Sequence, residues 1–133
     1  MLYNTLPLLG HSLDPRLDPV FAPMCTALSP AEAADLRRAV SAHVERIRSA
    51  LTTNEFLDVA TAERIANVLT GLLDDYACQT ELRRTLIVGA ARYFVQARDA
   101  EPDLASLLGL DDDVQVLNFV LDSIGRADLK VEP

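Results

Sequence analysis

The pattern that most constrains the fold is a stripe of apolar residues at helical spacing. After the segment SPAE at 29–32, apolar residues follow at intervals of four, four, three and four, at Leu36, Val40, Val44, Ile47 and Leu51. This periodicity predicts one long amphipathic helix. Ser29 suits the N-cap, Pro30 the first helical position, and Glu32 can complete a capping box. We therefore expect this helix to begin at Pro30.

The rest of the chain continues the helical pattern, and no strand pattern with turn signals is found. A second helix is expected at about 58–76 and a third near 80–98, where Thr80 can act as the cap. Gly89 has no side chain, so another helix can approach the third helix closely at that position. A last helix is expected at 112–124. The sequence thus predicts an all-α fold, a small single-domain bundle of about four main helices.

A short helix is expected between the third and the last helix, at 102–108. Pro102 suits its first position and Gly109 its C-terminal stop. Gly125 can end the last helix in the same way, and the segment RADLKVEP at 126–133 is interpreted as a tail. Local helix signals therefore place both ends of the short helix and the end of the last helix.

Residues 1–28 differ from the remainder because prolines interrupt them at positions 7, 15, 19 and 23. Proline fixes φ and removes a backbone donor, so no long helix fits this segment. The segment is also too apolar for a free tail. We expect a proline-rich N-terminal arm at 1–28 that packs on a helical domain at 29–133. A partner-binding or dimer-swapping arm is the alternative.

Charge and composition limit the classes of partner. The net charge is −8, and residues 67–133 carry twelve acids and six bases, which gives −6 for this half. Nucleic acid and anionic membranes are therefore not expected as partners. No apolar stretch reaches the roughly 18–20 residues of a membrane span, and no basic signal region precedes one, so a cytoplasmic protein is expected. Cys25 and Cys78 form no metal-binding or disulfide spacing, and we expect both to be small buried apolar groups.

Acidic residues cluster between positions 99 and 113. They are Asp99, Glu101, Asp103, Asp111, Asp112 and Asp113. Helix chemistry explains most of them, because anions are favoured in the first turn of a helix and aspartate is a good N-cap. In this interpretation Asp103 belongs to the first turn of the short helix, Asp111 caps the last helix, and Asp112 and Asp113 follow in its first turn.

The alternative interpretation is a ligand site. The carboxylates of Asp99, Asp103, Asp112 and Asp113 could together bind a divalent cation or a small polar ligand, or serve a hydrolase. The segment does not match an EF-hand, and the chain holds no HExxH, GxSxG or P-loop motif. No catalytic residue is assigned, and a divalent cation is the single cofactor to consider. An acidic docking face is a further option.

The same segment resembles a known family. The order of residues is Asp99-x-x-Pro102-Asp103, then Gly109, then Asp112-Asp113, then Val116-Leu117, after the aromatic pair Tyr93-Phe94. This order is similar to the signature of the YkvA-like bacterial family, a domain of unknown function. The resemblance covers about 90–120. It implies a small helical domain without an established activity.

The chain departs from the family pattern at three positions. Glu101 stands where the family has an aliphatic residue, Ser106 where it has a second proline, and Asp111 where it has an apolar or aromatic residue. Many relatives are apolar here and look membrane-associated, which this polar version does not share. Our leading hypothesis is a non-enzymatic helical module of the YkvA-like type that acts through a protein partner or self-association. A divalent-cation or small-ligand binding protein is the alternative.

Overall fold

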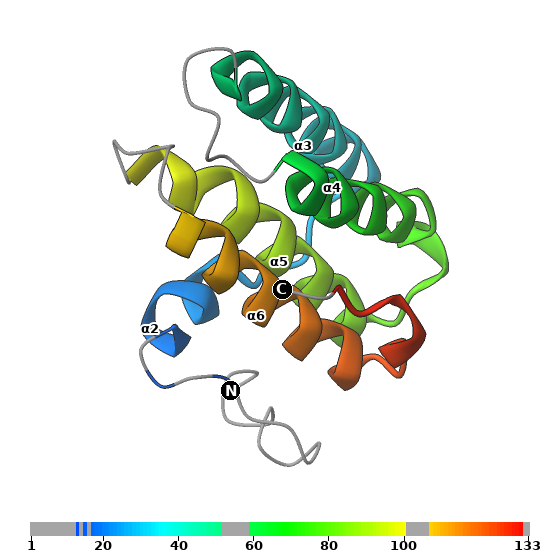
Figure 1. The fold of residues 1–133 in the computed structure, drawn as a ribbon. Coiled ribbons are helices and arrows are strands. Elements are labelled where there is room, and N and C mark those ends of the chain that lie inside the picture. The colour runs from blue at the N-terminus through cyan, green and yellow to red at the C-terminus, as the bar shows by residue number, and fades with distance from the viewer. Residues whose placement is uncertain (1–12, 14, 16, 52–58, 101–106, 132–133) are drawn as a thin grey trace.

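The computed structural model describes residues 13, 15, 17–51, 59–100 and 107–131, with backbone alone at 50–51, 96–100 and 107–111. Within these ranges every regular element is a helix (Figure 1). In chain order the elements are α2 (Asp18–Phe21), η2 (Ala22–Met24), α3 (Pro30–Leu51), α4 (Val59–Asp74), η3 (Tyr76–Cys78), α5 (Glu81–Ala100), α6 (Leu107–Ser123) and η4 (Ala127–Leu129). The predicted small all-α bundle is confirmed. None of the described helices is long and apolar enough to cross a membrane.

Two of the helix starts predicted from local sequence, those at Pro30 and after Thr80, are confirmed. The backbone N–H of Ser29 donates to Glu32 Oε1 at 3.0 Å, and the N–H of Glu32 donates to Ser29 Oγ at 3.1 Å. These two bonds form the capping box, and they lower the pKa of Glu32 because they favour its charged form. At the start of α5 the N–H of Arg83 donates to Thr80 Oγ1 at 3.3 Å. Thr80 therefore caps α5.

Gly125 ends α6, as the sequence predicts. Its φ is 77°, in the left-handed region that glycine adopts without strain. The N–H of Arg126 donates to the carbonyl of Leu121 at 2.7 Å, and the N–H of Gly125 donates to that of Asp122 at 3.3 Å. These paired bonds form a Schellman motif, which satisfies the last carbonyls of the helix and turns the chain back sharply.

The predicted boundary at 109–111 is wrong. Gly109 and Asp111 both lie inside α6, so Gly109 stops no helix and Asp111 is not an N-cap. Glycine inside a helix costs only about 1 kcal/mol relative to alanine, and the tertiary packing of an apolar helix such as α6 readily exceeds that penalty. Of the predicted short helix at 102–108, residues 107 and 108 belong to α6. The others, with Pro102 and Asp103, lie outside the described residues.

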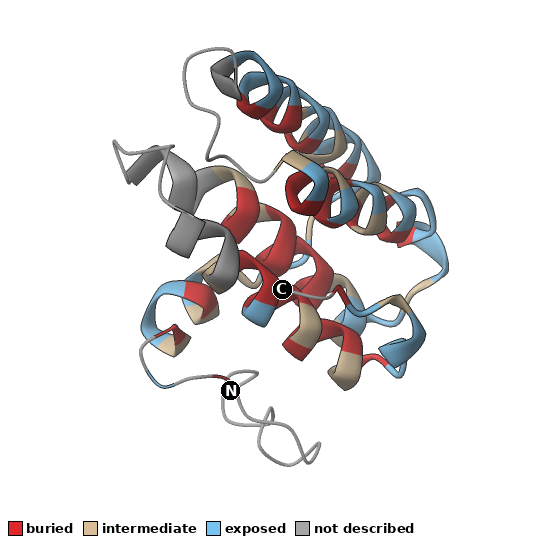
Figure 2. Cartoon of the chain, viewed as in Figure 1, coloured by how far each residue is buried: buried red, intermediate tan, exposed pale blue. Residues whose placement is uncertain are grey.

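Helix α5 is the centre of the bundle. It packs against α3, α4 and α6, and it also contacts the α2–η2 segment (Figure 1). Every residue from Thr85 to Ala91 is buried, so this stretch is enclosed on all sides (Figure 2). A helix with apolar residues on all its faces is normally surrounded by other elements of the protein. The uninterrupted run LIVGAA at 86–91 is the sequence sign of this central position.

The α2–η2 segment packs on α5 and α6 through Phe21. The Phe21 ring is fully buried and meets the Phe119 ring edge-on, with 6.1 Å between the ring centroids. It lies directly over Gly89, where an added Cβ would be 2.5 Å from Cys25 Sγ and 2.8 Å from Phe21 Cε1. The close approach expected at Gly89 is therefore made by the N-terminal segment, and it requires a residue without a side chain.

Candidate functional site

The structure places only part of the carboxylate site that the sequence suggests. Asp99 lies near the end of α5, where the backbone alone is described, and Asp103 lies outside the described residues. Asp112 is partly buried and Asp113 is 3% exposed, both on α6. Among the side chains that the structure describes, no group of three His, Cys, Asp or Glu residues could hold a metal ion. The cation site therefore stays a prediction.

Asp112 and Asp113 cannot form that site by themselves. They are consecutive residues in the second turn of α6, and consecutive side chains on a helix do not face each other. Their different burial agrees with two separate directions. Any shared ligand would need donors from another segment.

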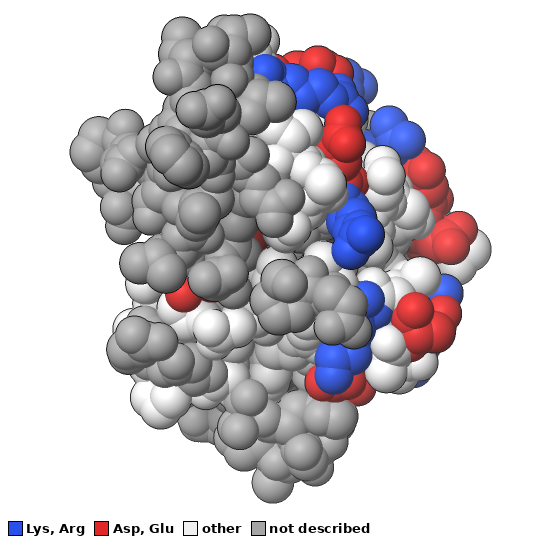
Figure 3. Space-filling view, in the orientation of Figure 1, with Lys and Arg blue, Asp and Glu red and all other residues white. Residues whose placement is uncertain are grey.

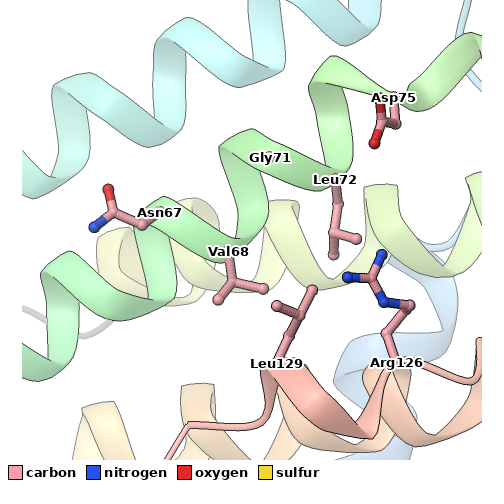
Figure 4. A pocket seen from close by; sticks show the side chains of 7 residues that line it. All are labelled: Asn67, Val68, Gly71, Leu72, Asp75, Arg126 and Leu129. Atoms are coloured by element: carbon pink, nitrogen blue, oxygen red, sulfur yellow. The ribbon is translucent and has the colours of Figure 1, made fainter.

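A pocket of about 400 Å³ lies between α4 and the C-terminal turn (Figure 4). It is lined by Asn67, Val68, Gly71, Leu72, Asp75, Arg126 and Leu129. The residues from α4 recur at helical spacing and so form one face of that helix. The opposite wall is the segment that follows Gly125.

The C-terminal wall of the pocket is held in place by a clasp to α6. Asn118 Nδ2 donates to the carbonyl of Val131 at 2.9 Å, and the N–H of Val131 donates to Asn118 Oδ1 at 2.9 Å. Lys130 Nζ also meets Asp122 Oδ2 at 3.0 Å. Val131 is buried beneath these contacts. The segment predicted as a tail is therefore a built part of the molecule, and it carries Leu129 into the pocket.

The rim of the pocket carries opposite charges. Arg126 Nε donates to Asp128 Oδ1 at 3.2 Å, and Arg126 Nη2 donates to Asp128 Oδ2 at 3.3 Å. These bonds, and then the negative charges of Asp128 and Asp75, raise the pKa of Arg126. The bond from Arg126 likewise lowers the pKa of Asp128. Because the pair is exposed, it orders the rim more than it stabilises the fold.

The floor of the pocket is apolar. Val68 and Leu72 project from α4 toward Leu129 of η4 (Figure 4). Gly71 lies between them on α4, and a Cβ added there would meet no atom within 4 Å. The pocket is thus open above Gly71, and no α4 side chain covers its floor at that point.

The basic residues of α3 do not form an anion site. Arg37 Nε is 2.7 Å from Asp74 Oδ1 and Arg48 Nη2 is 2.6 Å from Glu63 Oε2, so these pairs join α3 to α4. On the face shown in Figure 3, blue and red side chains alternate over the described residues and no large basic patch is visible. These arginines therefore belong to a solvated, charged face.

The histidine on α3 belongs to the core. His43 is fully buried, its ring meets Phe94 edge-on with centroids 4.9 Å apart, and Arg46 Nη2 lies 3.1 Å from its Nδ1. A guanidinium can only donate, so Nδ1 accepts this bond and the ring carries its proton on Nε2. His43 does not line the pocket, so it offers no base there.

The two cysteines are expected to differ sharply in reactivity. Burial raises the pKa of the Cys25 thiol to about 12, whereas Cys78 is exposed on η3, so the expected burial of both thiols is wrong for Cys78. Because the thiolate is the reactive form, a disulfide reagent should label Cys78 rapidly and Cys25 only after unfolding. The check is thiol titration with and without denaturant. A Cys78→Ser variant that still labels quickly under native conditions would contradict it.

Comparison of the chain with protein-family models, curated proteins and solved structures gives no significant match.

Proposed function

We propose that the protein is a non-enzymatic helical binding module that docks a protein partner at the pocket between α4 and η4. The supporting observation is the composition of this pocket. An apolar floor of Val68, Leu72 and Leu129 lies beneath a rim formed by Asn67, Asp75 and Arg126. Protein interfaces have the same arrangement, with an apolar anchor in a pocket and a polar rim that excludes water.

The chemistry of the lining favours binding over catalysis. None of the seven lining residues is a serine, cysteine or histidine, so no hydroxyl, thiol or imidazole of these residue types lines the pocket. Arg126 already donates two bonds to Asp128. These groups suit recognition of a side chain. The YkvA-like assignment belongs to the same proposal, since it implies a helical domain without an established activity.

Filling the pocket at Gly71 tests the proposal. A Gly71→Leu variant places a side chain in the open space above the floor, and leucine is a better helix former than glycine by roughly 0.8 kcal/mol. The variant should therefore fold at least as well as the original chain while losing its partner. Gly71→Ala is the matched control, because it improves the helix and leaves most of the pocket open.

The measurement is quantitative affinity capture from a lysate of the source organism with the three chains side by side. We expect a partner that the original chain and Gly71→Ala both capture and that Gly71→Leu does not. Equal capture by all three chains would place the interaction elsewhere on the surface and reject the pocket.

The rival carboxylate site is distinguished by a thermal-shift measurement. A site formed by Asp99, Asp103, Asp112 and Asp113 would bind the native state alone, so Mg²⁺, Ca²⁺ or Mn²⁺ would raise the melting temperature. Our proposal predicts no such rise beyond that of a matched increase in ionic strength. A rise with one cation that the Asp112→Asn variant abolishes would favour the rival.

A further inference from the structure

We infer that the segment that docks in the pocket between α4 and η4 carries an aliphatic side chain flanked by lysine or arginine. This inference rests on the proposed docking function and adds the chemistry of the partner. Three features support it: the apolar floor, the excess of carboxylates at the rim and directly beside it, and the negative net charge of the described residues in the half of the chain that forms the pocket.

The floor selects an aliphatic anchor. The pocket of about 400 Å³ exceeds the roughly 300 Å³ at which sites for small ligands begin, so it has room for a branched aliphatic side chain. Val68 and Leu72 line one side and Leu129 the other. Burying an aliphatic group there removes apolar surface of both partners from water, which is the main favourable contribution to such docking.

The rim selects positive charge beside that anchor. Asp75 lies in the rim, and Asp128 lies directly beside it because it is bonded to Arg126. The two carboxylates carry two negative charges against the single positive charge of Arg126, so these three residues sum to −1. Two donors of Arg126 are already directed at Asp128. An acidic partner would meet Asp75 and Asp128 as like charges, whereas a basic partner can approach Asp75 and the exposed oxygens of Asp128 without breaking a bond.

The surroundings of the pocket extend this preference. The neighbouring carboxylates Asp74 and Asp122 are paired with Arg37 and Lys130, so they add no net charge to the rim. All seven lining residues belong to residues 67–133, and the side chains that the structure describes in this half, at 67–95 and 112–131, carry seven acids and five bases. A field of this sign speeds the encounter with basic segments and slows that with acidic ones.

A second copy of the chain fits the pocket less well. Val20, at 45% exposed, is the one large exposed apolar side chain among the described residues. It lies on α2 next to Pro19 and close to Asp18, so it would bring another carboxylate to an acidic rim. In α3, Ile47 is an aliphatic residue flanked by two basic residues, Arg46 and Arg48. Its side chain is buried in the core, so it cannot enter the pocket of another copy. Charge complementarity thus favours a foreign basic segment.

The test uses a library of random short peptides displayed on phage. Peptides are selected on the full chain, and those that also bind the Gly71→Leu variant are removed. We expect the survivors to be enriched in a leucine, isoleucine, valine or methionine next to lysine or arginine. For a synthetic peptide of the selected sequence, Asp75→Asn should weaken binding by about three- to tenfold, and added salt should weaken it further.

Glu45→Gln is the control for Asp75→Asn. It removes the same charge from α3, outside the lining of the pocket, and should leave the affinity for the peptide nearly unchanged. If the two variants weaken peptide binding equally, the loss of affinity comes from the net charge of the protein. The proposal that the rim carboxylates select a basic partner would then be overturned.

The remaining outcomes separate the inference from the proposed function. Survivors with neutral or acidic flanks would overturn the basic partner while leaving the pocket as a docking site. No survivors after removal of the Gly71→Leu binders would overturn both. A dimer in sedimentation that Gly71→Leu dissociates would show that a second copy is the occupant, and so would overturn the inference.

Discussion

Replacing Phe21 by alanine should lower the free energy of unfolding by about 3–5 kcal/mol, the range found for large buried aromatic residues. The ring is fully buried, packs edge-on against Phe119 of α6, and covers Gly89 of α5. Its removal would open a cavity between two helices whose positions are fixed by the rest of the bundle. Little of that cavity can collapse, so we expect a cost in the upper part of the range.

Urea unfolding followed by circular dichroism measures this effect, and Val20→Ala is the matched control. Val20 precedes Phe21 on α2 but is 45% exposed, so its truncation should change the free energy by no more than about 0.5 kcal/mol. If the two variants lose similar amounts, the N-terminal segment does not belong to the cooperative core. The same comparison therefore tests whether residues up to 28 pack on the helical domain as an arm.

Alanine at Gly89 is expected to destabilise the protein although alanine is the better helix former. The new Cβ would lie 2.5 Å from Cys25 Sγ and 2.8 Å from Phe21 Cε1, and both contacts are shorter than van der Waals packing permits. Such overpacking costs typically about 1–3 kcal/mol, against a gain of about 1 kcal/mol in helix propensity. The α2–η2 segment must shift away from α5, so we expect a net loss.

The same substitution at Gly71 should have the opposite sign. A Cβ at Gly71 meets no atom within 4 Å, so the propensity gain of up to about 1 kcal/mol is not opposed by a clash. Urea unfolding of Gly89→Ala and Gly71→Ala compares one chemical change in two environments. Adding Cys25→Ala to Gly89→Ala should restore part of the lost stability, as a double-mutant cycle would measure. Stabilisation by both single substitutions would contradict the close packing at Gly89.

Those features of the fold that depend on neighbouring residues could be predicted from the sequence. Ser29 with Glu32, Thr80, and Gly125 each act within a few residues, and each marks a helix end in the structure. Gly109 failed as a stop because a local signal can be outweighed by tertiary packing. Cys78 was expected to be buried from its residue type alone, although its position in a turn exposes it.

The pocket could not be predicted because it depends on contacts between distant segments. Val68 and Leu72 lie in the helix predicted at about 58–76, but the sequence does not show that Leu129 lies opposite them. That wall exists because Asn118 binds the backbone of Val131, thirteen residues further along the chain. The available sign was Asn118, a polar residue between apolar neighbours in the last helix. The carboxylate site predicted from Asp99 and Asp103 involves side chains beyond the described residues and stays a prediction.

The clasp between Asn118 and Val131 also supplies an internal reporter of local motion. The Val131 N–H donates to Asn118 Oδ1, with 2.9 Å between the nitrogen and the oxygen, and Val131 is buried. Its amide proton therefore exchanges with solvent only when the clasp opens. Exchange of this proton, compared with that of the central amides of α5, gives the free energy of local opening of the pocket wall separately from that of global unfolding. Slowing of Val131 exchange by a ligand would therefore reveal that the ligand closes this wall, without any substitution in the pocket.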